Sequence, residues 1–380
     1  MKTRWEYLEF EDCIDKIVYT NKIKRKDFLV KGEYKIISQE ENYINGYWNA
    51  ESDLFKIIKP VVIFGDHTKN LKYIDFDFVL GADGVKIFQP IDCINTKYFY
   101  YFLKSVKLKD LGYARHYRLL KEIKVPLPPI PEQKRIVKIL DEAFAAIDKA
   151  KSNAEKNLQN SRELFDSYLN KVFANPEEDW IECFLNDYVK FIDYRGRTPE
   201  KTTQGMRLIT AKNIKNGYLQ KEPEEFVNPN IYDSWMTRGI PNKGDILFTT
   251  EAPLANVAQL DTDEKVVFAQ RTIIFQPDPK FFNQSFLKYL LLSKPIKTRI
   301  IEKGTGATVK GIKAKLLKQI PIYFPQSLAK QERIVDKLNN LSDEIKKLET
   351  IYQQKLADLD ELKKSILQKA FDGELTRNNG

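Results

Sequence analysis

The residues best suited to catalysis in this 380-residue chain are few. It has two histidines, His67 and His116, and neither has a Cys or His neighbour at metal-ligand spacing. The stretch 65-GDHTKN-70 places Asp66 beside His67, a combination that suits a metal or an acid–base pair. A polar turn after a strand over 61–64, with side chains that face a partner, is the favoured interpretation. A hidden enzyme using Asp66 and His67 stays a remote alternative.

Other catalytic patterns are absent from the sequence. The stretch 306-GATVKGIK-313 approaches a phosphate-binding loop but lacks the Gly-Lys-Ser/Thr that would contact the phosphates. No Gly-rich turn follows a first strand, as dinucleotide or S-adenosylmethionine sites require. There is no Asn-Pro-Pro-aromatic stretch of an amino-methyltransferase and no acidic pair with the Glu-x-Lys of a nuclease. We therefore predict a non-catalytic chain that holds neither a metal nor a cofactor.

Composition limits the class of protein. Hydrophobic residues make up 42% and aromatic residues 12%, which is typical of a folded chain. Apolar runs such as 287-LKYLLL-292 are too short to span a bilayer, and no secretory signal opens the sequence. The three cysteines, Cys13, Cys93 and Cys183, are too scattered for a disulfide framework. We predict a reduced, cytoplasmic protein without membrane contact.

The positive charge is divided equally between two segments. Residues 1–131 contain 22 Lys and Arg against 18 Asp and Glu, and residues 176–329 contain the same numbers, so each segment carries a net +4. The stretches 132–175 and 330–380 are nearly neutral. This distribution suggests two similar units that face one polyanion, although ordinary solubilising charge remains an alternative.

An internal duplication explains this symmetry. The stretches 132-EQKRIVKILDE-142 and 330-KQERIVDKLNN-340 match at an offset of 198 residues, and the register holds without a gap to Phe173 and Phe371. Both copies lack Pro and Gly almost to their ends and are rich in helix formers. Their apolar residues recur at steps of three and four, which predicts a coiled-coil seam. The seam residues are Ile136, Leu140, Ile147, Leu164, Tyr168, Ile334, Leu338, Leu341, Ile345, Leu348, Leu359, Leu362 and Ile366.

Connectivity fixes how such helices can pair. Since residues 176–329 join the end of the first helix to the start of the second, helices that pair with each other must run antiparallel. A helix of 44 residues is about 65 Å long. We therefore predict globular domains over 1–131 and 176–329, related by an approximate two-fold axis, and long helices over 132–175 and 330–380. A long core helix within each domain is the alternative.

The two globular segments also resemble each other. Each opens with Trp and acidic residues (4-RWEYLEFEDC-13 and 179-DWIECFLNDYV-189) and closes on 119-LLKEIKV-125 or 316-LLKQIPI-322. Strand-like runs at 34–38, 61–65, 245–250 and 271–276 alternate with Asn-Gly, Asp-Gly and Lys-Gly turns. The fold class predicted is α+β, with a curved, mostly antiparallel sheet in each segment.

Polar loops in both segments carry side chains suited to phosphates and base edges. A solvated surface loop is the ordinary explanation for any one of them, but duplicated units of one charge sign favour DNA. The candidate DNA-binding residues are Lys22, Lys24, Arg25, His67, Lys69, Arg115, His116, Arg118, Arg195, Arg197, Lys212, Asn213, Lys215, Asn216, Gln270, Arg271, Thr308 and Lys310.

At this point the sequence resembles the specificity subunit of type I restriction-modification systems, over essentially the whole chain. The resemblance rests on the helix openings 128-PPIPEQKRIV-137 and 325-PQSLAKQERIV-335 and on the helix ends 167-SYLNKVFAN-175 and 365-SILQKAFDGEL-375. The stretches 65-GDHT-68, 211-AKNIKNG-217 and 244-GDILFT-249 add to it. The second opening departs from the usual Glu-Gln, with Lys330 before Gln331.

The resemblance implies two target-recognition domains, each of which reads half of a bipartite site on double-stranded DNA, with the helices setting the spacing. It also implies partners: two methyltransferase subunits, which would bring S-adenosylmethionine, and restriction (translocase-nuclease) subunits. The competing hypothesis is a coiled-coil scaffold whose globular units bind protein.

Overall fold

The computed structural model describes residues 5–81, 84–112, 114–196, 198–306 and 310–376. The chain divides into two compact units, and each contains part of both long helices. Unit 1 comprises Met1–Glu155 and Gln353–Gly380, and unit 2 comprises Lys156–Tyr352. The long helices are α3 (Ile130–Ala174) and α9 (Leu328–Phe371).

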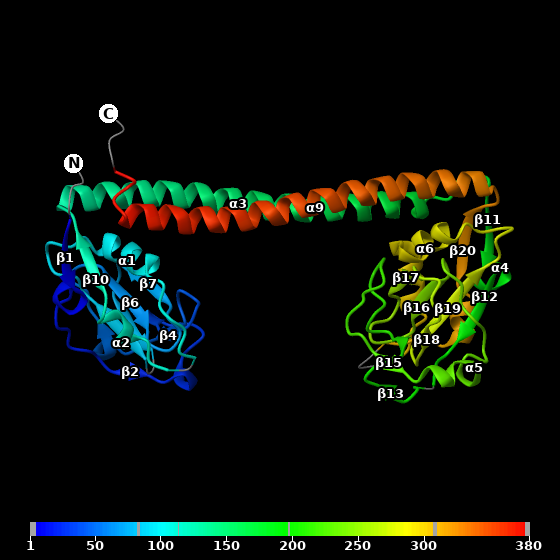
Figure 1. The fold of residues 1–380 in the computed structure, drawn as a ribbon, viewed down its shortest axis with the longest axis horizontal. Helices are drawn as coiled ribbons and strands as arrows, with labels where there is room; N and C mark the ends of the chain where they lie inside the picture. The colour runs from blue at the N-terminus through cyan, green and yellow to red at the C-terminus, as the bar shows by residue number, and fades with distance from the viewer. Residues whose placement is uncertain (1–4, 82–83, 113, 197, 307–309, 377–380) are drawn as a thin grey trace. The chain divides into compact units, whose positions relative to one another are not determined.

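Unit 1 is built from short strands and two small helices (Figure 1). Its described strands form three sheets: β1 with β10, the order β7-β6-β9, and the order β2-β8-β3-β4 with β5 paired to β8. The strands are β1 (Glu6–Glu9), β2 (Lys22–Ile23), β3 (Tyr34–Ile37), β4 (Gly46–Trp48), β5 (Leu54–Phe55), β6 (Val61–Gly65), β7 (Leu71–Ile74), β8 (Phe78–Gly81), β9 (Val85–Phe88) and β10 (Lys124–Leu127). The helices are α1 (Thr96–Ser105) and α2 (Tyr117–Leu120), with 3-10 turns η1 (Phe10–Cys13), η2 (Arg25–Asp27) and η3 (Glu51–Asp53).

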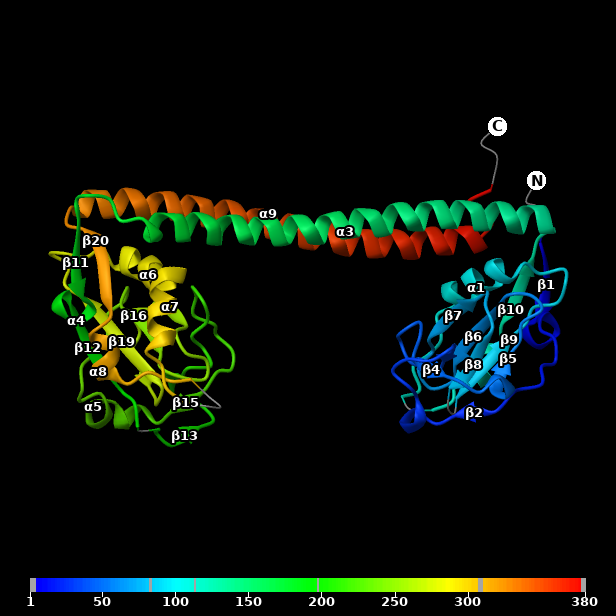
Figure 2. The same cartoon turned by 180° about the vertical axis from the view of Figure 1, so that it is seen from behind.

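Unit 2 repeats this plan with different loops (Figure 2). Its described sheets are β11 with β20, the order β12-β19-β16-β17, and the order β13-β15-β14-β18. The strands are β11 (Trp180–Phe184), β12 (Val189–Asp193), β13 (Lys201–Thr202), β14 (Met206–Ile209), β15 (Phe226–Val227), β16 (Ile246–Thr249), β17 (Val257–Gln259), β18 (Val267–Phe268), β19 (Thr272–Pro277) and β20 (Pro321–Pro325). The helices are α4 (Leu185–Tyr188), α5 (Tyr232–Trp235), α6 (Gln284–Leu292), α7 (Lys294–Glu302) and α8 (Ala314–Lys318), with the 3-10 turn η4 (Pro229–Ile231).

The predicted strands at 34–38, 61–65, 245–250 and 271–276 are present as β3, β6, β16 and β19. The prediction of one sheet in each segment was wrong, because each unit divides its strands among three sheets. Pairing is mostly antiparallel, but β8 runs parallel to β2 and β3, and β18 runs parallel to β14. Strands this short cannot cover a hydrophobic core alone, so several small sheets and the helices bury it together.

Each core encloses the start of one long helix and the end of the other. In unit 1, Ile136 and Leu140 of α3 join Phe371 of α9 in one buried cluster with α1. In unit 2, Leu338 of α9 joins Phe173 of α3 in a cluster with α6. Burying one such Phe stabilises the fold by about 1.5–3 kcal/mol. The long helices are therefore part of both hydrophobic cores.

Ion pairs fix the direction in which the two helices pass each other. In unit 1, Lys151 bonds Asp360 at 2.6 Å and Asp148 bonds Lys363 at 2.8 Å. A later residue of α3 therefore meets an earlier residue of α9. In unit 2, Arg162 bonds Glu349 at 2.6 Å, while residues nearer the end of α3 meet the start of α9. The segments are antiparallel within each unit, as predicted.

The predicted seam is correct at some positions and wrong at others. Ile136, Leu140, Ile147, Leu338 and Ile345 are buried, and Tyr168, Ile334, Leu341, Leu359 and Ile366 are half-buried. Leu164, Leu348 and Leu362 are exposed instead, at 58%, 40% and 46%. A helix has 3.6 residues per turn, so a strict heptad line turns out of the interface by about 20° per heptad. Phe165, one residue after Leu164, is half-buried and packs against the core of unit 2 instead.

Candidate nucleic-acid interface

The turn after β6 organises one end of unit 1. The Asp66 backbone N–H donates to the Gly84 carbonyl at 2.7 Å, and the Asp66 carbonyl accepts from the His116 N–H at 2.8 Å. The Asp66 carboxylate accepts from the Tyr117 N–H at 2.7 Å, at the start of α2. Lys69 bridges the same two segments through an ion pair of 3.0 Å with Asp110. The predicted residues His67, Lys69, Arg115 and Arg118 are thus carried on adjoining segments.

The loop at Gln39 attaches a further basic segment to this turn. The Gln39 carbonyl accepts from Thr68 Oγ1 at 2.6 Å and from Asn70 Nδ2 at 3.0 Å. The next residue, Glu40, pairs with Arg25 of η2 at 2.6 Å. Lys22 and Lys24 lie beside Arg25 and are exposed. Figure 1 shows β2 and α2 at the end of unit 1 away from α3.

Unit 2 gathers its basic residues at the corresponding end. Arg195 donates to both carboxylate oxygens of Asp193, with Nη2–Oδ2 at 2.7 Å, and reaches the Ile312 carbonyl at 3.4 Å. Burial alone would raise the pKa of Asp193, but the hydrogen bonds from Arg195 outweigh it and the pKa is lowered. Arg271 pairs with Glu251 at 2.9 Å. The carboxylates hold both guanidiniums in place.

A second loop borders this cluster. Asn256 Nδ2 donates to the Ile214 carbonyl at 2.9 Å, and the Gly217 N–H donates to the Val257 carbonyl at 2.8 Å. This places Lys215 and Asn216 next to the turn between β16 and β17. Lys212, Gln270 and Lys310 are exposed, and Lys212 contacts Glu225 at 3.5 Å. Arg197 and Thr308 lie outside the described residues.

Two predicted contact residues are buried, which corrects the expectation that they face a partner. His116 is fully buried: its Nε2 accepts from the Leu111 N–H at 3.1 Å, so its Nδ1 donates to the Asp66 carbonyl at 3.0 Å. Asn213 is 1% exposed, and its amide bonds Thr210 and three backbone carbonyls at 3.0–3.3 Å. Both buried side chains are paired with backbone groups, and their polar atoms would cost free energy if left unpaired.

Some residues that shape this end were not found from the sequence. Arg238 donates to the carbonyls of Asp193 at 2.6 Å and Arg195 at 3.0 Å, across more than forty residues of chain. Glu251 orients Arg271 from the preceding turn. Neither belongs to a short motif, so only the folded chain brings them to their partners. Among the described residues there is no group of three or more His, Cys, Asp or Glu placed to hold a metal.

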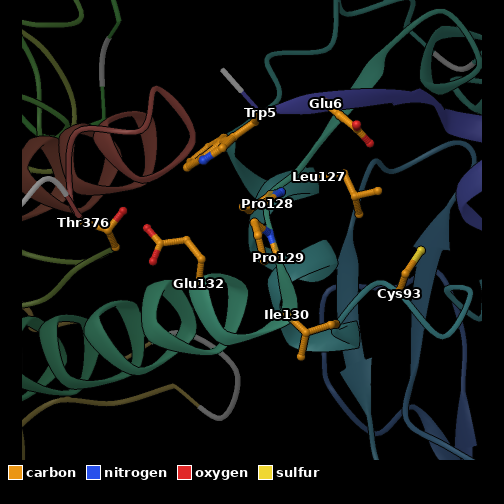
Figure 3. Close-up of a pocket in the computed structure, with 9 residues that line it drawn as sticks. All are labelled: Trp5, Glu6, Cys93, Leu127, Pro128, Pro129, Ile130, Glu132 and Thr376. Carbon is orange, nitrogen blue, oxygen red and sulfur yellow. The ribbon is translucent and has the colours of Figure 1, made fainter. Parts of the chain in front are cut away.

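A cavity lies elsewhere in unit 1, beside the start of α3. It has a volume of about 750 Å³ and is open to solvent. Figure 3 shows Trp5, Glu132 and Thr376 on one side of Pro128 and Pro129, with Leu127 and Cys93 on the other. None of the predicted DNA-binding residues that the structure describes lines it.

The fold and these two basic ends define a duplicated recognition protein, in which similar domains present different polar side chains. Comparison with known proteins identifies the family. The chain belongs to the family of the Type I restriction modification DNA specificity domain, whose model matches residues 2–157 and again 177–355. This confirms the predicted fold class and the predicted family. Since its relatives are named specificity subunits, it also confirms a non-catalytic chain.

Two relatives illustrate how far the similarity extends. The chain is 26% identical over 368 residues to the type I restriction enzyme EcoBI specificity subunit of Escherichia coli, covering 87% of this chain and 75% of that one. It is 25% identical over 331 residues to the type I restriction enzyme MjaVIII specificity subunit of Methanocaldococcus jannaschii, covering 79% and 75%.

Solved structures share the fold. A chain from a type I R-M system, solved to explain complex assembly and conformational transition, superposes with a TM-score of 0.74 at 16% identity and 98% coverage of both chains. The HsdS subunit from Thermoanaerobacter tengcongensis gives 0.59 at 16% identity, covering 98% of this chain and 97% of that one. No helix within the described ranges is both long and apolar enough to cross a membrane.

Proposed function

We propose that this chain gives a type I restriction-modification complex its DNA specificity, and that the basic end of each unit reads one half of a bipartite site. The observation that carries the proposal is the repetition of one turn scaffold with different side chains upon it. In unit 1 the scaffold presents His67, Lys69 and Arg118, and in unit 2 it presents Arg195 and Arg271. Different side chains on one scaffold suit two half-sites of different sequence.

The complex would supply what this chain lacks. We infer two methyltransferase subunits that bind S-adenosylmethionine, together with restriction (translocase-nuclease) subunits, all acting on double-stranded DNA in the cytoplasm. The long helices and their joints to the units would dock the methyltransferases. Each helix would also act as a spacer of about 65 Å between the two readers.

A methylation assay tests the assignment. The purified chain alone should not methylate DNA, and the methyltransferase partner with the chain should methylate adenines in one bipartite motif. DNA binding by the assembled complex should weaken steeply with salt, because phosphate contacts release counterions. Methylation of the same motif by the partner without this chain would contradict the proposal. Binding that ignores salt would favour the protein-scaffold alternative.

A deletion tests the spacer. Removing residues 152–158 together with 353–359 takes facing heptads from α3 and α9 and keeps the register of the Lys151–Asp360 pair. The helices shorten by about 10 Å, so the spacer between half-sites should change by about three base pairs. Both half-sites should keep their sequence. The full-length double variant Lys156→Ala and Gln354→Ala, which changes exposed residues only, serves as the control. A changed half-site would exclude the spacer role.

A further inference from the structure

Gly84 of unit 1 and Arg271 of unit 2 occupy the same place in the duplicated scaffold. Each immediately precedes the strand that pairs antiparallel with β6 or β16, namely β9 or β19. The carbonyl of each accepts a hydrogen bond from the residue that follows β6 or β16: Asp66 N–H to Gly84 at 2.7 Å, and Thr250 N–H to Arg271 at 2.9 Å. The strand registers agree, since Gly65 faces Val85 and Thr249 faces Thr272.

Further backbone bonds of the turn confirm this correspondence. Lys69 N–H donates to Gly65 at 2.8 Å, and Ala255 N–H donates to Thr249 at 2.9 Å. Lys69 and Ala255 both have left-handed backbone, with φ of 61° and 66°. In both units a later segment of the chain also bonds this turn: His116 N–H donates to the Asp66 carbonyl at 2.8 Å, and Ile312 N–H donates to the Thr250 carbonyl at 3.0 Å.

In both units the residue before this strand has left-handed backbone. Gly84 has φ of 87° and Arg271 has φ of 72°. Glycine adopts this conformation without a steric penalty, whereas the Cβ of arginine clashes with its own backbone there. Non-glycine residues in this region tend to persist where the side chain has a task. Unit 2 therefore keeps an arginine at a position where glycine would be easier.

The two units differ at Gly84 and Arg271, and they also differ in the side chain that lies beside this position. His67 follows Asp66 in unit 1, and Glu251 follows Thr250 in unit 2. A Cβ on Gly84 would lie 2.8 Å from His67 Cδ2 and 2.7 Å from Gln39 Oε1, so a side chain there would have to displace His67 and Gln39. In unit 2, Arg271 Nε lies 2.9 Å from Glu251 Oε1 in an ion pair.

The ion pair with Glu251 leaves the terminal guanidinium nitrogens of Arg271 able to contact DNA. Its side chain is 46% exposed and that of Glu251 is 43% exposed. The contact at 2.9 Å is made by Nε, and within the described part of the chain the terminal nitrogens of Arg271 form no hydrogen bond. Two N–H groups in this geometry match the O6 and N7 acceptors of guanine in the major groove, the commonest specific contact of arginine with DNA.

We propose that Arg271, oriented by Glu251 and by its left-handed backbone, reads a guanine in the half-site that belongs to unit 2. At the same place unit 1 has Gly84 and offers His67, so the two half-sites differ at this position. The proposal rests on the DNA-reading function proposed above.

The test uses the full chain with its methyltransferase partner on a DNA library randomised around the methylated motif, with modified adenines read by sequencing. The variants are Arg271→Gly, which relaxes the backbone, and Arg271→Lys, which keeps the charge but not the forked geometry. Lys243→Gln is the matched control, because Lys243 is an exposed cation of the same unit in an ion pair of 3.1 Å with Asp263.

Wild type should prefer guanine at one position of one half-site, and both Arg271 variants should lower that preference about tenfold or more. The other half-site should stay unchanged, and Lys243→Gln should behave as wild type. The melting temperature of Arg271→Gly should be no lower than that of wild type. A loss of guanine preference in this variant can then not be explained by unfolding. A wild-type complex without any bipartite motif would overturn the proposed function itself. A wild-type motif that both Arg271 variants leave unaltered would overturn only this inference.

Discussion

Gln133 and Gln331 make the same three hydrogen bonds, each within its own unit. Gln133 Oε1 accepts from the Asn95 N–H at 2.7 Å, and its Nε2 donates to the carbonyls of Cys93 at 2.9 Å and Pro128 at 2.8 Å. Gln331 repeats the set with Asn283, Phe281 and Pro325 at 2.8, 2.7 and 2.9 Å. Both glutamines are fully buried. Each one joins the start of a long helix to the loop that caps α1 or α6.

Replacing Gln133 by leucine should destabilise unit 1 strongly. The variant would leave the Asn95 N–H and the carbonyls of Cys93 and Pro128 without this partner, and the Pro128 carbonyl bond is fully buried. An orphaned buried group costs about 1–3 kcal/mol. Gln354→Leu is the matched control, because Gln354 is exposed and bonds only Asp358, at 2.7 Å. Thermal unfolding of both variants measures the difference. Equal melting temperatures would show that the buried hydrogen bonds contribute little.

Two of the ion pairs between the long helices correspond to each other in the duplication, with their charges exchanged. At the 198-residue offset Lys151 corresponds to Glu349 and Asp360 to Arg162, so α3 supplies the cation in both pairs. We expect Lys151→Glu to lower the stability of unit 1 because it opposes Asp360, and Lys151→Glu with Asp360→Lys to restore it. A double-mutant cycle at low and high salt measures the coupling. Additive losses at low salt would contradict a direct interaction.

Lys72 should make the stability of unit 1 depend on pH in alkaline solution. Its Nζ is buried against the Asn42 carbonyl and Asn45 Oδ1, at 2.5 and 2.9 Å, and burial lowers its pKa from 10.5 to about 8. Between these two pH values the unfolded chain binds a proton that the folded chain has released, so stability rises with pH. Below about pH 8 both states are protonated, and the cost of burying the ammonium is present in full.

Comparison with Lys72→Met isolates this effect, because the other ionisable groups are the same in both proteins. The stability of wild type relative to the variant should increase from about pH 8 towards pH 10.5 and level off outside that range. Chemical denaturation at a series of pH values measures it. A relative stability that is flat across this range would contradict the burial of a charged Lys72.

One cysteine should react much faster than the other two. Cys93 is exposed and lines the cavity beside α3, whereas Cys13 is buried and Cys183 is half-buried. Burial raises the pKa of both Cys13 and Cys183 to about 12, so little thiolate forms near neutral pH. A chromogenic disulfide should label one thiol rapidly in the native chain, and Cys93→Ser should remove that phase. Fast labelling of Cys93→Ser would contradict the assignment.

Local patterns predicted the long helices and several strands well. The spacing of apolar residues and the absence of Pro and Gly are properties of contiguous sequence, and α3 and α9 begin only two residues before the predicted starts. The register of the seam was predicted less well, since Leu164 and Leu362 turn outward. Which side of a helix faces its partner depends on winding summed over many turns, and short repeats do not specify it.

Sequence patterns alone were enough to find the duplication, the long helices that join its copies, and the family. Which polar residues are placed to meet a partner became clear only from the folded chain. His116 and Asn213 carry groups that could bind DNA, but both side chains are buried inside the fold. The correspondence of Gly84 with Arg271 is hidden in the sequence, because loops of unequal length shift the offset from 198 in the helices to 187 here. Backbone hydrogen bonds depend on positions in space, so only the folded chain reveals it.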